Sequence, residues 1–73
     1  MDNLVWVVAT TADFQRAGIP LTTERISLDG TKAIKHINTL TVEEWNAIRS
    51  DLAFQFLGEE GCTEMLTGAE WTE

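Results

Sequence analysis

The sequence predicts an α+β fold, a small mixed sheet of about three strands packed by one main helix. Two stretches carry this prediction. Residues 4–9 form a short apolar run rich in β-branched side chains, which is typical of a strand buried on both faces. Residues 41–57 predict a helix that leads directly into a strand. Apolar residues first recur every three or four positions, as in a helix, and then alternate with other residues, as in a strand. With 73 residues, the chain forms one domain at most.

The main helix is expected to begin at Thr41. Thr41 and Glu44 have the spacing of a capping box, in which each side chain accepts a hydrogen bond from the other residue's backbone N–H. The apolar residues of the segment fall on one face: Val42, Trp45, Ile48 and Leu52. Trp45 is therefore predicted to be the largest core residue of the helix. A strand over residues 52–57 follows, and Gly58 ends it.

The segment after the first strand has helix signals at both ends. Thr10, Thr11 and Asp13 supply capping groups for a short helical turn, with Phe14 facing the core. Gly18 suits a left-handed terminating position, and Pro20 stops the helix.

A second strand is expected over residues 22–28, with Ile26 and Leu28 on one face. Asp29-Gly30 is a strong turn signal, and a two-residue turn pairs Ile26 with Ala33. That register leaves Ile34 on the opposite face, so two alternatives stay open for residues 31–39. They form either a hairpin strand or an extended excursion held by Ile34 and Ile37.

The chain changes character at Gly58. Residues 1–58 are predicted to form the compact α+β domain, and residues 59–73 an acidic, partly ordered C-terminal tail. Trp71 either packs back on the domain or contacts a partner. The residues proposed for partner binding are Trp71, Glu59, Glu60, Glu64 and Leu66. Deletion of residues 59–73 is expected to leave a folded core and to weaken binding.

The charge is one-sided. Of the formal net charge of −7, none comes from residues 1–40, where four acidic residues balance four basic ones. Residues 41–73 carry eight acidic residues against Arg49 alone. This surface repels phosphates, so we expect a protein partner and no direct nucleic-acid binding.

No catalytic, cofactor-binding or metal-binding set stands out. His36 and Cys62 lack a third orienting group, and Glu59, Glu60 and Glu64 lack the ligand ladder of a calcium loop. We therefore expect no enzyme activity and no cofactor. A single cysteine, no membrane-length apolar run and no signal-peptide start favour a protein of the cytoplasm without a membrane partner.

Three pieces in order resemble a known family. They are Val5–Ala9, then Asp-Phe-Gln-Arg-Ala-Gly-Ile at residues 13–19, then Leu-Thr-Val-Glu-Glu-Trp-Asn-Ala-Ile-Arg-Ser-Asp at residues 40–51. Over residues 4–57 the chain is similar to the N-terminal domain of small proteins encoded by Mu-like prophages. Gln15 stands where that family often has Arg, and residues 29–39 form a longer stretch than the family has.

The resemblance implies a compact α+β domain, a phage origin and a gene placed among virion-assembly genes. It also implies a location in the bacterial host cytoplasm or on the virion. Family members often continue into a small helical domain proposed to bind nucleic acid, and the acidic residues 59–73 do not support that role here. The function expected is a small phage accessory protein that acts by protein–protein contact, in virion assembly. The alternative is an acidic inhibitor or nucleic-acid mimic that blocks a basic site on a host protein.

Overall fold

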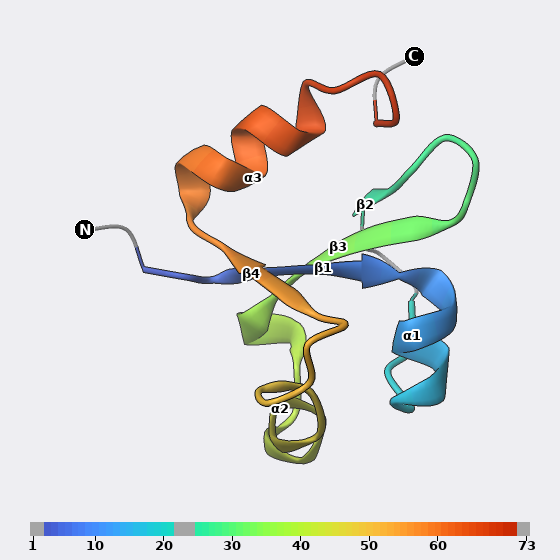
Figure 1. Cartoon of the computed structure of the whole chain (residues 1–73). Helices are drawn as coiled ribbons and strands as arrows, with labels where there is room; N and C mark the ends of the chain where they lie inside the picture. The colour runs from blue at the N-terminus through green and yellow to red at the C-terminus, as the bar shows by residue number, and fades with distance from the viewer. Residues whose placement is uncertain (1–2, 22–24, 72–73) are drawn as a thin grey trace.

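The computed structural model describes residues 3–21 and 25–71, which form a four-stranded antiparallel sheet with helices on both faces (Figure 1). The strands are β1 (Trp6–Thr10), β2 (Arg25–Ile26), β3 (Lys32–His36) and β4 (Gln55–Leu57). The helices are α1 (Thr11–Arg16), the 3-10 helix η1 (Ile37–Thr39), α2 (Val42–Ile48) and α3 (Glu59–Leu66). The α+β class is confirmed.

The prediction of a mixed sheet of about three strands is wrong. The strand order is β2-β3-β1-β4, and every neighbouring pair is antiparallel. Strands β3 and β4 run in the same direction, but β1 lies between them. The connection through η1 and α2 therefore crosses over β1, and no parallel pair forms. Of the second strand predicted over residues 22–28, only Arg25–Ile26 are paired, and residues 22–24 lie outside the described residues.

The sheet is buried on both faces. On one face, α1 and α2 enclose a cluster formed by Val7, Ala9, Phe14, Ile19, Ala33, Ile48 and Phe54. On the other face lie α3 and the chain after it (Figure 1). They enclose a second cluster formed by Val8, Ile34, Cys62 and Trp71. Successive side chains of β1 and β3 supply the two clusters alternately. Strand β1, which takes up residues 6–9 of the apolar run, is thus a central strand with both faces covered, as predicted, whereas Leu4 lies outside the strand and is 58% exposed.

The turn at Asp29-Gly30 does join a hairpin. Ile26 pairs with Ala33, which is the register that a two-residue turn predicts. Ile34 does face away from Ile26 and Ala33, but this is consistent with a hairpin because α3 covers that second face and Ile34 is 1% exposed there. Ile26 and Leu28, expected on one face of the second strand, are 41% and 55% exposed because they lie at the edge strand and its turn.

The first helix follows its local signals. The Thr10 hydroxyl accepts a hydrogen bond from the Asp13 N–H at 3.1 Å, which caps α1. Phe14 is fully buried. Gly18 has φ of 76°, the left-handed conformation predicted for it. The backbone N–H of Ile19 then donates to the carbonyl of Phe14 at 2.9 Å, which turns the chain back over the sheet.

Helix α2 has the predicted capping box but not the predicted core face. Thr41 N–H donates to the Glu44 carboxylate at 2.9 Å, and Glu44 N–H donates to the Thr41 hydroxyl at 3.1 Å. Ile48 is its one buried residue. Trp45 is 36% exposed and lies edge-on against Phe56 at the rim of the cluster, so its assignment to the core is wrong.

Val42 and Leu52, also expected on that face, are 76% and 101% exposed. A helix of seven residues touches the sheet over about one turn, so apolar residues beyond that turn find nothing to cover them. Leu52 lies in the turn before β4, and the strand begins only at Gln55.

Candidate functional site

The residues proposed for partner binding lie on α3 and the turn after it. The helix begins after Gly58, which supplies no side-chain cap, and Glu59 and Glu60 place negative charge in the first turn, where the helix dipole favours it. The helix ends at Thr67, whose hydroxyl donates to the carbonyl of Glu64 at 2.7 Å. The segment predicted as a partly ordered tail thus contains an eight-residue helix, while residues 72–73 lie outside the described residues.

The inward face of α3 holds the helix on the sheet. Cys62 is buried beside Val8 and Ile34, and Met65 and Leu66 pack against the same cluster. Gly61 faces Leu57, and an added Cβ there would lie 3.5 Å from the Leu57 side chain, which is an ordinary van der Waals contact. Leu66, proposed as a partner contact, is half-buried in this cluster and offers a partner only part of its side chain.

Trp71 packs back on the domain, which confirms the first of the two alternatives drawn for it. Its side chain is 2% exposed and completes the cluster beneath α3. Its backbone N–H donates to the carbonyl of Gly68 at 3.0 Å, and its carbonyl accepts from the Arg25 guanidinium at 3.0 Å. In this arrangement Trp71 is a core residue that is almost wholly covered, and it forms a small part of the lining of a groove.

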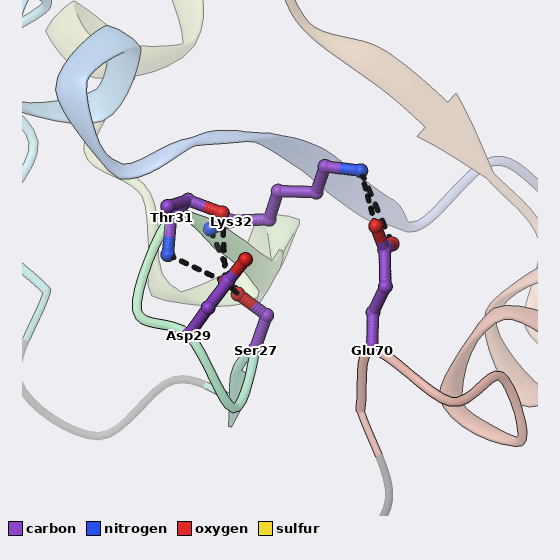
Figure 2. A network of polar contacts seen from close by, with 5 residues as sticks. All are labelled: Ser27, Asp29, Thr31, Lys32 and Glu70. Atoms are coloured by element: carbon purple, nitrogen blue, oxygen red, sulfur yellow. Dashed lines mark hydrogen bonds and ion pairs between the residues drawn. The ribbon is translucent and has the colours of Figure 1, made fainter.

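The neighbouring Glu70 fastens the same segment to the β2–β3 hairpin. Its carbonyl accepts a hydrogen bond from the Leu28 N–H at 2.8 Å. Its carboxylate accepts from the Lys32 ammonium at 3.0 and 3.1 Å, as Figure 2 shows. Both Lys32 and Glu70 are partly exposed, so this ion pair contributes about 1 kcal/mol or less. Its effect is to position the chain that carries Trp71.

The hairpin turn has its own polar network (Figure 2). One carboxylate oxygen of Asp29 accepts hydrogen bonds from the Ser27 hydroxyl at 2.7 Å and from the Thr31 N–H and hydroxyl at 3.0 and 2.7 Å. These bonds, the Ser27 hydroxyl first, lower the pKa of Asp29 to about 2. The Ser27 hydroxyl also accepts from the Lys32 N–H at 3.0 Å. The network closes the turn, so we assign it a structural role.

The outward face of α3 is a group of exposed carboxylates. Glu59, Glu60 and Glu64 surround Thr63, and all four residues are exposed or line a shallow hollow between them. None of the three glutamates forms a salt bridge with any described residue. Within residues 3–21 and 25–71, no group of three His, Cys, Asp or Glu side chains is arranged to hold a metal ion. The chemistry that this face offers is therefore that of three unpaired negative charges on a helix.

The His36 and Cys62 pair is not assembled as a nucleophile. Burial, together with the charge of Glu59, raises the pKa of the Cys62 thiol, which keeps it in the less reactive neutral form. The His36 Nδ1 atom accepts a hydrogen bond from the Asn38 N–H at 3.0 Å, and its ring lies edge-on against Trp6. Among the described residues, no hydrogen bond joins His36 to Cys62.

Comparisons with protein-family models, with curated protein sequences and with solved structures find no match for this chain. The resemblance to Mu-like prophage proteins therefore rests on the sequence motifs of residues 5–51. No helix in the described part of the chain is long and apolar enough to cross a membrane.

Proposed function

We propose that this protein is a small accessory protein that acts by protein–protein contact through the outward face of α3. One observation carries the proposal. Glu59, Glu60 and Glu64 are exposed and unpaired among the described residues, on a helix that Cys62, Met65 and Leu66 hold against the sheet. Fixed charges of one sign favour a partner surface of the opposite sign and raise its rate of encounter. The partner we propose is a protein with a basic patch.

The biological setting that we propose is virion assembly in a phage or prophage. Its support is the resemblance of residues 4–57 to Mu-like prophage proteins, through the motifs at residues 13–19 and 40–51. We propose no chemical step. The buried thiol of Cys62 is neutral at physiological pH, and His36 has its Nδ1 atom occupied by Asn38.

A second function, mimicry of nucleic acid, gains support from the position of the carboxylates. Mimicry requires negative charges held at fixed spacings, and a mobile tail would not supply them. Glu60 and Glu64 lie four residues apart in α3, which places their backbones about 6 Å apart along the helix axis. Such a row of charges could occupy a site that a host protein uses for phosphates.

The test is capture of a partner with the immobilised protein and with a triple variant, Glu59→Gln, Glu60→Gln and Glu64→Gln. These substitutions remove the charges and keep the shapes of the side chains. The matched control is Glu43→Gln, which neutralises an exposed first-turn glutamate of α2 that takes no part in the capping box.

We expect a protein captured from phage-infected lysate to be lost with the triple variant and retained with the control. Retention by the triple variant would refute the role of α3. Duplex DNA added as a competitor separates the two functions, because displacement of the captured protein by DNA indicates mimicry, whereas a partner that DNA leaves bound indicates an ordinary assembly contact.

A further inference from the structure

Strand β4 forms one edge of the sheet, and its outward backbone groups can be identified from the ladder. The Ile37 N–H donates to the Val5 carbonyl and the Thr11 N–H to the Thr31 carbonyl, each at 2.9 Å. Odd-numbered residues of β1 therefore bond toward β3, and even-numbered residues toward β4. The hydrogen-bonded partners of β1 in β4 are thus Gln55 and Leu57. Phe56, paired with Val7, directs its N–H and its carbonyl away from the sheet.

This edge is open, whereas the opposite edge is partly covered. No described residue bonds the N–H or carbonyl of Phe56. At the other edge, the chain after α3 reaches the β2–β3 hairpin, where Glu70 accepts the Leu28 N–H. Proteins commonly protect a free edge by keeping the edge strand short or by placing charged residues or proline in it. Strand β4 is three residues long, but residues 55–57 contain neither a charged residue nor proline.

Apolar surface flanks the open edge on both faces of the sheet. On the α2 face, Trp45 is 36% exposed and lies edge-on to Phe56, with the ring centroids 5.4 Å apart. On the α3 face, a groove of about 270 Å³ lies beside the beginning of β4. Its lining is mixed, because Val8, Leu52 and Met65 share it with the Lys32–Glu70 ion pair. An added strand would place alternate side chains against these two surfaces.

The charges around β4 indicate which kind of strand fits. Asp51 lies four residues before β4, and Glu59 and Glu60 follow it after Gly58. An antiparallel pairing of β4 with a second copy would bring Asp51 of one copy toward Glu59 and Glu60 of the other, and like charges oppose that arrangement. A segment with cationic ends would be attracted instead.

We propose that β4 accepts an extended segment of a protein partner as an added edge strand, a segment with apolar side chains and Lys or Arg at its ends. The site shares with the proposed function the need for a protein partner and the carboxylates of Glu59 and Glu60. It differs in requiring the backbone of Phe56, so an N-methyl group on Phe56 tests it separately from the triple glutamine variant of α3.

The probe is a capped peptide with the sequence Lys-Val-Thr-Val-Thr-Val-Lys. Its binding to the isotope-labelled full chain is measured from changes in the backbone amide chemical shifts. We expect shifts at Phe54, Phe56 and Gly58, and protection of the Phe56 amide from hydrogen exchange only when the peptide is present. A peptide with Glu in place of both Lys should bind at least about fivefold more weakly at low salt.

The decisive variant carries an N-methyl group on Phe56 and keeps every side chain. It can be assembled by ligation of residues 1–61 to residues 62–73 at Cys62, and the unmethylated ligation product is the matched control. We expect the N-methyl group to weaken peptide binding at least about tenfold, because it removes one hydrogen bond and blocks approach to the edge.

Several results would overturn the proposal. They are equal binding by the methylated and control chains, shifts confined to residues away from β4, or equal binding of the Glu-ended peptide. Shifts of Phe56 that depend on protein concentration without peptide would show that a second copy occupies the edge, which also contradicts the proposed occupant.

Discussion

Replacing Trp71 with alanine removes the largest side chain of the cluster beneath α3. An indole buries about 150–250 Å², which corresponds to about 4–6 kcal/mol at about 25 cal/mol per Å². Alanine recovers part of this area, while the cavity left beside Val8 and Ile34 adds a cost, so we expect a loss of about 3–5 kcal/mol. A domain of 73 residues has roughly 4–11 kcal/mol of stability in total. Trp71→Ala should therefore leave the domain marginal or unfolded.

The assay is urea unfolding followed by far-UV circular dichroism, since a fluorescence signal would itself change with the tryptophan. The backbone bonds of residue 71 to Gly68 and Arg25 persist in the alanine variant, so the difference reports the side chain. Trp45→Ala is the matched control. Trp45 is 36% exposed at a rim where water fills the space it leaves, so we expect about 2 kcal/mol.

Equal losses for the two tryptophan variants, or a loss below about 1 kcal/mol for Trp71→Ala, would refute the assignment of Trp71 to the core. The same reasoning changes the expectation for deletion of residues 59–73. The sequence alone predicts a folded core after deletion. In the structure the deletion would expose Val8 and Ile34, which are 7% and 1% exposed in the intact domain. We now expect the shortened chain to lose cooperative unfolding.

Three further predictions concern local signals. Gly18→Ala should lower the free energy of unfolding in urea by about 1 kcal/mol, because φ is 76°. Crowding adds no cost, since an added Cβ would meet nothing within 4 Å. An unchanged free energy of unfolding would contradict the left-handed conformation. Thr41→Ala should cost about 1 kcal/mol through loss of the N-cap, and Thr41→Ser should restore most of it. The pKa of Asp29 is lowered to about 2 in the folded state from the usual 3.8, so its stabilisation is present above about pH 4 and is lost as the pH falls through about 2. Acid unfolding of Asp29→Asn should lack that contribution, and an unchanged acid transition would show that the turn network does not stabilise the fold.

The structure confirms the predictions that depend on residues close together in the sequence. The Thr41–Glu44 capping box, the Thr10 cap, the buried Phe14 and the left-handed Gly18 all depend on groups within a few residues of one another. Asp29-Gly30 also predicts the pairing of Ile26 with Ala33 that the structure has, but the sequence alone leaves the hairpin open because Ile34 falls on the other face of the strand. The exposed glutamates of residues 59–64 could be named from the sequence because charged side chains almost always face water, in a tail as in a helix.

The choice between core and surface for the large apolar residues depended on tertiary structure. The sequence shows that residues 4–9 suit a strand with two buried faces, but it does not show which segment covers the second face. Once α3 lies there, Ile34 has a partner, the hairpin becomes consistent, and Trp71 enters the core. Trp45, Val42 and Leu52 end outside it because α2 is short and meets the sheet mainly through Ile48. Periodicity fixes the relative directions of side chains along one element, whereas burial depends on what packs against that element from elsewhere in the chain.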